Sequence, residues 1–289
     1  MLRNLLFGIL LATLALSCQD PGEIITVPDN TAPPDVTVSE VIKENYVNKL
    51  YISLLGRKPE SSELVQGMAT LAQDNASTAN RAELMDDIFT NPGFGERMYD
   101  VARTEMLNNL DTAQISLQIY FLTVLLDSPA YEPFYDLIIQ ETTKLQELKD
   151  TPYDLIDGTI GRIEMHKRCV NNLFYDEINM GSQNFVLAMF EYFFNRYPTE
   201  VEERDAIAMV DGFTTLMFGK EGHSKTDFIQ LFFASDDYFE GQVINVYRDF
   251  LFREPTSQEM GLHTTSYKQA LDYQELLKAI LTTDEYLGI

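Results

Sequence analysis

Basic residues are scarce in this sequence, with 21 Lys and Arg against 45 Asp and Glu and a formal net charge of −24 at pH 7. Nucleic acids are bound through a footprint of Lys and Arg that neutralises their phosphates. The charge balance therefore excludes nucleic-acid binding, and it disfavours adsorption to anionic lipid headgroups. An acidic surface of this kind is otherwise typical of a well-solvated protein.

Motifs for catalysis and cofactor binding are missing as well. The sequence has no Gly-x-Ser-x-Gly turn, no phosphate-binding loop and no Cys-x-x-Cys-His haem site. Glu164, His166 and Cys169 come nearest to a ligand cluster, but a zinc site needs four ligands, or three and a water. We expect a packed Cys beside an exposed His, and we predict no catalytic residue, no metal and no cofactor.

Tryptophan is absent, and cysteine is limited to Cys18 and Cys169. Tryptophan is the largest aromatic platform for sugars, so its absence argues mildly against a glycan-binding surface, which stays an alternative. If Cys18 is acylated, Cys169 has no partner for an intrachain disulfide. The fold must then be stabilised by its hydrophobic core.

Long apolar runs are also lacking, apart from residues 5–16, which are too few to span a bilayer. With Arg3 ahead of it, this run has the layout of an export signal. Ala15-Leu16-Ser17-Cys18 resembles a bacterial lipobox, which implies that Cys18 becomes the acylated first residue of the mature chain. The alternative is an ordinary cleaved signal peptide with an incidental Cys.

We therefore predict a lipoprotein signal peptide over residues 1–17 and a disordered tether over 18–38, where four prolines occur without helical periodicity. Asp20 and Glu23 resemble the signals of Bacteroidetes-type surface lipoproteins. This resemblance implies a protein anchored to the outer membrane through Cys18 and exposed on the cell surface. The periplasmic face of that membrane is the alternative.

What the sequence does contain is a pattern that occurs three times. In each copy an aromatic residue and an apolar pair precede Arg-x-Pro, and a Glu lies four residues after the Pro. The copies share the Arg, Pro and Glu at Arg57, Pro59 and Glu63, at Arg196, Pro198 and Glu202, and at Arg253, Pro255 and Glu259. Further on, each copy has a polar-x-x-aromatic sequence, at Asn91–Phe94, Ser235–Tyr238 and Thr283–Tyr286. This pattern predicts helical repeats.

Helical periodicity and the absence of strand-like alternation predict an all-α fold. We predict a multi-helix array in which repeat 1 covers 39–110 and repeats 2 and 3 cover 179–289. A helical middle segment over 111–178 separates them, with helices at 115–126, 133–148 and about 160–175. Repeats 2 and 3 should share one helix, and the sequence ends before a fourth helix of repeat 3.

The motif arginines allow two interpretations. They could form a ladder that binds carboxylates or sulfated sugars, because Arg presents a bidentate fork. The interpretation we favour is structural: each Arg meets the negative end of the helix before it and pairs with the Glu six residues later.

At these motifs the sequence resembles a helical repeat domain of unknown function in bacterial secreted and surface proteins, itself similar in pattern to phycobilisome linkers. The first copy, from Leu55 to Arg97, also looks like a helical domain of planctomycete-type secreted proteins that occur with cytochrome c modules. The resemblance implies binding or spacing modules, and it brings no catalytic residue to this chain.

The leading functional hypothesis is a non-enzymatic, surface-exposed lipoprotein that serves as a binding or scaffold module for another envelope protein. An alternative is a substrate-binding accessory for nutrient capture, which would bind a glycan or small molecule in a concave pocket lined by Tyr and Arg. Its candidate ligand-facing residues lie in the middle segment: Tyr120, Tyr131, Tyr135 and Tyr153. An enzyme or redox accessory is the third hypothesis.

Overall fold

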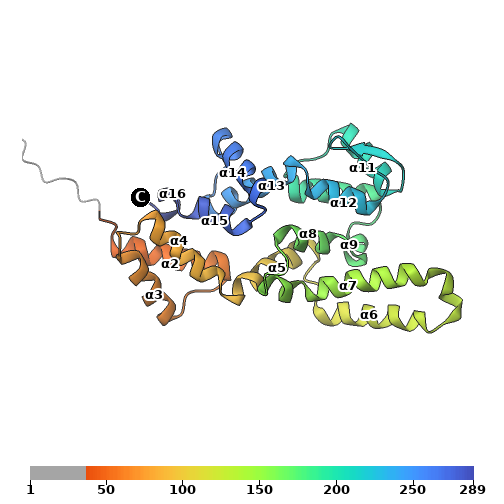
Figure 1. The fold of residues 1–289 in the computed structure, drawn as a ribbon, viewed down its shortest axis with the longest axis horizontal. Coiled ribbons are helices and arrows are strands. Elements are labelled where there is room, and N and C mark those ends of the chain that lie inside the picture. Colours follow the sequence, from red (N-terminus) through yellow and green to blue (C-terminus); the bar gives the residue numbers. More distant parts are fainter. Residues whose placement is uncertain (1–36) are drawn as a thin grey trace, which may run out of the picture. The chain divides into compact units, whose positions relative to one another are not determined.

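The computed structural model describes residues 37–289, of which Val38–Ile289 form one compact unit. The predicted signal peptide, the lipidation site Cys18 and most of the predicted tether lie outside the described residues. The described part is almost entirely helical, which confirms the all-α prediction (Figure 1). In this part, no helix combines the length and the apolar character needed to cross a membrane.

Repeat 1 consists of α2 (Glu40–Leu55), α3 (Ser61–Ala72), α4 (Thr78–Phe89) and α5 (Pro92–Met106). The side chain of Ser39 accepts a hydrogen bond from the amide of Ile42 and caps α2, which ends at Gly56 in the left-handed conformation, with φ of 69°. Asn91 caps α5, and Pro92 occupies its first turn. Each of these helix ends is formed by a residue type that favours such a position, namely a Ser or Asn cap at the start and a Gly at the end.

The middle segment begins with a helical hairpin of α6 (Thr112–Leu126) and α7 (Tyr135–Ile156), joined by the 3₁₀ helix η1 (Pro129–Phe134). It ends with two short helices, α8 (Arg162–Val170) and α9 (Leu173–Ile178), where the sequence suggested a single helix. Figure 1 shows α6 and α7 side by side, and α7 also packs on α5.

The predicted end of the 133–148 helix is wrong, because α7 continues through Pro152 to Ile156. Proline has no amide to donate to the carbonyl four residues earlier, which belongs to Leu148. That carbonyl instead accepts the hydroxyl of Tyr99 from α5, at 3.5 Å. A tertiary contact thus replaces the missing helical hydrogen bond.

Repeat 2 contains α10 (Ser182–Met189), the π-helical turn η2 (Phe190–Phe194), α11 (Glu200–Val210), α12 (Lys225–Phe233) and α13 (Asp236–Val246). Repeat 3 continues from α13 through η3 (Tyr247–Leu251), α14 (Ser257–Ala270) and α15 (Tyr273–Leu281) to α16 (Asp284–Leu287). The predicted sharing of one helix is confirmed in α13. The fourth helix of repeat 3, predicted to be missing, is present as the short α16.

A small antiparallel hairpin in repeat 2, β1 (Thr215–Met217) and β2 (Lys220–Gly222), was not predicted. Its two-residue loop, Phe218-Gly219, has positive φ at both positions, as type I′ hairpin turns require. The strands are three residues long, too short to show alternation, and Phe218 is an unusual residue for such a turn.

Repeat 3 packs against repeat 1, although the two lie at opposite ends of the described chain. The rings of Tyr46 in α2 and Tyr286 in α16 are 5.7 Å apart, and the Tyr46 hydroxyl donates to the carbonyl of Leu281 at 3.0 Å. In Figure 1, α15 and α16 lie beside α2 and α4. The first and last helices of the repeat array are therefore in contact.

Candidate functional site

The motif arginines form the same set of contacts in all three repeats. Each guanidinium binds both carboxylate oxygens of the Glu six residues later, at distances between 2.6 and 2.9 Å. The same Glu accepts the backbone amide at the N-cap of its own helix, so that one carboxylate links the Arg to the start of the next helix. The predicted pairs are therefore formed: Arg57–Glu63, Arg196–Glu202 and Arg253–Glu259.

The helix-end contact of these arginines differs from the expected one. Each Nη1 donates to the carbonyl of the residue directly after the Arg, at 3.0 to 3.2 Å, and not to the last turn of the preceding helix. The reason is that the residue directly before each Arg (Gly56, Asn195 or Phe252) adopts the left-handed conformation and ends the helix there. The guanidinium also lies over the motif's first aromatic ring, Tyr51, Phe190 or Tyr247.

Repeats 2 and 3 add a second carboxylate to each motif arginine. Asp237 in the first turn of α13 pairs with Arg196, and Glu285 in the first turn of α16 pairs with Arg253. Gly93 occupies the equivalent position in repeat 1. The guanidinium groups of Arg196 and Arg253 are thus occupied by protein carboxylates.

The environment of His166 corrects the expectation of an exposed His. This side chain is buried, and its Nδ1 lies 2.9 Å from the hydroxyl of Tyr238. Burial, together with the charge of Arg162, lowers the pKa of His166 well below its usual value, so the ring is neutral at pH 7.

Burial also raises the pKa of Cys169 to about 12. Glu164 pairs instead with Lys167 and Arg168.

No metal-binding cluster was found within residues 37–289, where no three His, Cys, Asp or Glu side chains are placed to hold one ion.

The four tyrosines singled out in the middle segment do not converge on a pocket. Tyr120, Tyr131 and Tyr153 are exposed, while Tyr135 is partly buried and donates its hydroxyl to the carbonyl of Ser128 at 3.2 Å. None of them lines a cavity found in residues 37–289. Tyr120 and Tyr131 belong instead to an apolar surface on the hairpin.

This surface, the hairpin patch, contains a group of large, exposed apolar side chains on α6, η1 and the start of α7: Leu117, Tyr120, Phe121, Val124, Tyr131, Phe134, Leu137 and Ile139. Leu117, Phe121 and Val124 follow helical spacing and form one stripe along α6. Only Ile115 of α6 is buried. The helix has no charged residue.

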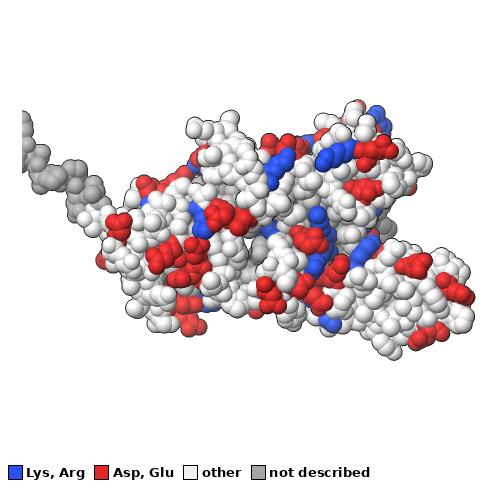
Figure 2. Space-filling view, in the orientation of Figure 1, with Lys and Arg blue, Asp and Glu red and all other residues white. Residues whose placement is uncertain are grey.

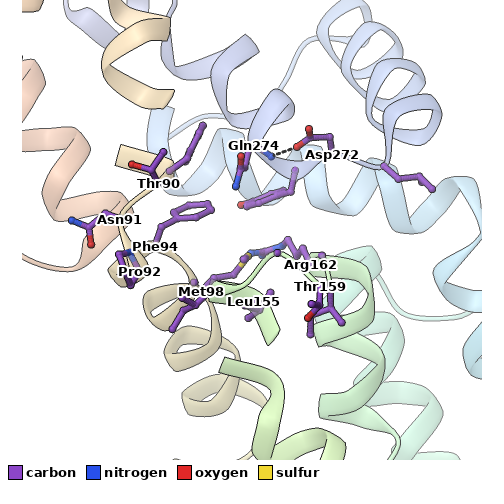
Figure 3. A pocket seen from close by; sticks show the side chains of 18 residues that line it. Thr90, Asn91, Pro92, Phe94, Met98, Leu155, Thr159, Arg162, Asp272 and Gln274 are labelled. Atoms are coloured by element: carbon purple, nitrogen blue, oxygen red, sulfur yellow. Dashed lines mark hydrogen bonds between the residues drawn. The ribbon is translucent and has the colours of Figure 1, made fainter. Parts of the chain in front are cut away.

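A second feature, a cavity of about 440 Å³, lies where α5, α8 and α15 begin. Phe94 and Met98 contribute apolar side chains, and Arg162, at the start of α8, contributes a guanidinium. Figure 3 shows Arg162 and Met98 approaching each other along one wall, with Asp272 and Gln274 on the opposite wall. We call this space the α8 cavity.

Arg162 was missed by the sequence analysis, since it belongs to no motif. Its Nε donates to Oε1 of Gln242 at 3.0 Å, and its guanidinium lies 4.2 Å from the ring centre of Tyr273. These partners come from α13 and α15, far from Arg162 in the sequence. The local sequence offers one indication of where Arg162 lies, since Gly161 and Arg162 stand at the start of a helix.

Comparison with known proteins gives no relative: no family model, no curated protein and no solved structure matches this chain.

Proposed function

We propose that the protein is a non-enzymatic binding or scaffold module of the cell envelope, anchored through Cys18, that docks another envelope protein on the hairpin patch. The lipobox-like sequence before Cys18 supports the anchor. The single observation that carries the docking function is the hairpin patch, an extended apolar surface on a strongly acidic protein.

The energetics favour a protein partner for this surface. Exposed apolar area costs about 25 cal/mol per Å² relative to burial, and patches of this kind on soluble proteins mark interaction sites. Two packed helices leave their outer faces open, and further helices close such faces in a bundle. We therefore expect the partner to contribute an apolar helical surface to the α6–α7 hairpin.

The charges around the hairpin patch narrow the chemistry of this partner. Residues 111–157 contain nine Asp and Glu but only two Lys, and Figure 2 shows the hairpin at lower right as mostly uncharged surface interrupted by carboxylates. A second copy of this chain, or an anionic membrane, would bring like charges together. A partner with Lys and Arg around an apolar centre complements the patch.

The test combines a photo-crosslinking residue at Tyr120 with the double variant Leu117→Glu/Phe121→Glu, assayed in the native envelope. Both replaced side chains are about half exposed, so the fold should tolerate the change. The matched control is Val201→Glu/Leu262→Glu, at apolar positions exposed on α11 and α14.

The proposal expects one stoichiometric crosslinked protein, retained in the control variant and lost in the hairpin variant. The complex should weaken as salt rises, because its rim is charged. A dimer of this chain in analytical ultracentrifugation that the hairpin variant abolishes would overturn the proposal. So would crosslinking to lipid or glycan with no protein partner.

A further inference from the structure

His166 places a titratable ring in an aromatic part of the core. Its side chain is buried, and its ring centre lies 5.0 Å from that of Phe193 and 6.2 Å from that of Phe233. Nδ1 contacts the hydroxyl of Tyr238 at 2.9 Å, whereas Nε2 has no hydrogen-bond partner among the described residues. The ring is thus held through one nitrogen, and the other is buried without compensation.

The contact in which His166 takes part joins two different regions of the chain. Helix α8 belongs to the middle segment, and α13 is shared by repeats 2 and 3. Within residues 37–289, two polar contacts and no ion pair connect these helices: Arg162 with Gln242 at 3.0 Å, and His166 with Tyr238. The residue numbers rise along α8 and fall along α13, so the helices run antiparallel. We call this contact the α8–α13 seam.

The charges on α8 itself offer no counter-ion to a protonated His166. Arg162 lies one turn earlier and has the same sign as an imidazolium, so it opposes protonation. The remaining charged side chains of the helix are engaged towards α7. Arg168 binds Asp154 at 2.6 Å, and Glu164 pairs with Lys167 and Arg168.

The elements around the ring present hydroxyl groups instead of free carboxylates. The hydroxyls belong to Tyr238 on α13, Tyr192 in η2, Tyr267 on α14 and Tyr99 on α5. Burial raises the pKa of all four, so they stay neutral. The carboxylates of these elements and of α12 have other partners: Asp237 with Arg196, Glu105 with the Tyr192 hydroxyl, and Asp227 with the amide of His223.

A proton on His166 therefore has no place in the closed seam. Burial, and then the charge of Arg162, lower the pKa of this ring well below the ordinary 6.5. An exposed His binds a proton below pH 6.5 while the buried ring stays neutral, so acid favours the open form. The stability of the seam is complete above pH 6.5, and the open-to-closed ratio rises about 10-fold for each pH unit below it.

One end of the seam already meets solvent. Arg162 lines the α8 cavity, whose volume is about 440 Å³. His166 lies one helical turn further in, so an opening that starts at the cavity exposes the imidazole to water after a small separation of the helices.

We propose that His166 makes the α8–α13 seam an acid-sensitive contact: when the ring binds a proton, α8 separates from α12 and α13, and the middle segment is released from repeats 2 and 3. This regulatory property is independent of the docking function, because the hairpin patch lies on α6, η1 and α7.

The experiment is hydrogen exchange of the full chain in detergent at pH 7.5, 6.5 and 5, read by mass spectrometry. Protection factors are compared, because they remove the intrinsic pH dependence of amide exchange. We expect the amides of α8 and α13 to lose about 30-fold in protection between pH 6.5 and 5. Those of α2 and α3 should change by less than about 3-fold.

His166→Gln removes the titration and keeps an amide that can contact Tyr238, so it should abolish this acid response. His223→Gln and His263→Gln are the matched controls. His223 is exposed beside Asp227, and His263 is half-buried on α14 against Tyr247. Both variants should keep the response.

Tyr238→Phe keeps the test decisive if His166→Gln does not fold. It removes the hydrogen bond and leaves the titrating ring, so it should lower protection of the seam by the same factor at each pH and preserve the 30-fold difference. An NMR titration of the wild-type ring nitrogens should show His166 neutral in the closed protein at pH 5.

Four results would overturn the proposal. Seam protection that does not fall by pH 5 is the first, and an acid response that persists in His166→Gln is the second. The third is an equal loss of protection throughout residues 38–289, which would indicate global acid unfolding. The fourth is a His166 ring that titrates near pH 6.5 while α8 and α13 stay protected.

Discussion

At the residue scale, the repeat motif is explained by the contacts that a single guanidinium forms at the same time. Its planar fork matches both oxygens of a carboxylate, its Nη1 reaches the next carbonyl, and its face lies on an aromatic ring. Lysine provides neither a planar face nor paired donors. This explains why the aromatic residue, Arg, Pro and Glu recur together at fixed spacing.

The first prediction concerns the Arg196–Glu202 pair. The hydrogen bond from Arg196, followed by the amide of Thr199, lowers the pKa of Glu202 from an ordinary 4.5 to about 2 despite partial burial. A carboxylate with a lowered folded-state pKa contributes stability above pH 4.5, and this stability is lost as pH falls towards 2. Glu202→Gln should therefore cost about 1–3 kcal/mol at pH 7 and progressively less below pH 4.5.

Urea unfolding at pH 7, 4 and 3 measures this difference. Glu200→Gln is the control, because Glu200 lies in the same first turn of α11 but is exposed and unpaired. It should change the free energy of unfolding by less than about 0.5 kcal/mol. A Glu202→Gln effect that is the same at every pH would refute the assigned role of the charge.

At this scale, the Arg–Glu pairs could be predicted from the sequence because both partners lie within six residues. The burial of His166 and the position of Arg162 could not. Their environment comes from Tyr238, Gln242 and Tyr273, which are 70 or more residues away along the chain. Local patterns do not contain that information.

At the scale of the element, the packing of α13 depends on a single glycine. A Cβ added at Gly241 would lie 1.8 Å from the carbonyl oxygen of Phe193 in η2, so the two helices approach at backbone distance. Because the obstructing atom is backbone, no side-chain rotation can relieve the overlap.

The second prediction compares two glycines in helices. Gly241→Ala should cost at least about 3 kcal/mol, because the helices must move apart and the aromatic core of repeat 2 must open. Gly261, in α14, has open space around it, and Gly261→Ala should stabilise by about 0.5–1 kcal/mol through helix propensity. Chemical denaturation of both variants tests the contrast. Equal effects at the two sites would show that the close approach is absent.

Helix starts are the features of this fold that follow most directly from local sequence. Ser39, Asn91, Ser235 and Thr283 each cap the helix that follows. The interactions are local, so they can be inferred without the fold. The continuation of α7 through Pro152 depends on the Tyr99 hydroxyl and could not be inferred in that way.

At the scale of the whole molecule, the contact between repeats 1 and 3 brings a buried charge into the fold. Arg81 in α4 is buried, and its Nη2 donates to Oδ1 of Asp284 in α16 at 2.7 Å. Its Nε and Nη1 have no partner among the described residues. The sequence did not predict this contact, since Arg81 and Asp284 are separated by almost the whole repeat array.

The third prediction follows from the unequal burial of this pair. Asp284→Ala leaves the Arg81 guanidinium buried without a carboxylate and should cost about 2–4 kcal/mol, somewhat less than for a fully buried pair because Asp284 is largely exposed. Arg81→Met removes the charge together with its unsatisfied donors. It should cost less than about 1 kcal/mol or even stabilise.

The double variant Arg81→Met/Asp284→Ala should recover most of the stability that Asp284→Ala loses, and urea unfolding of the four proteins gives the coupling energy. Because Arg81 and Asp284 join repeats 1 and 3, Asp284→Ala should also expose the first and last repeats to earlier local unfolding, measurable by hydrogen exchange. If Arg81→Met costs more than Asp284→Ala, the buried guanidinium stabilises this contact through interactions other than its ion pair.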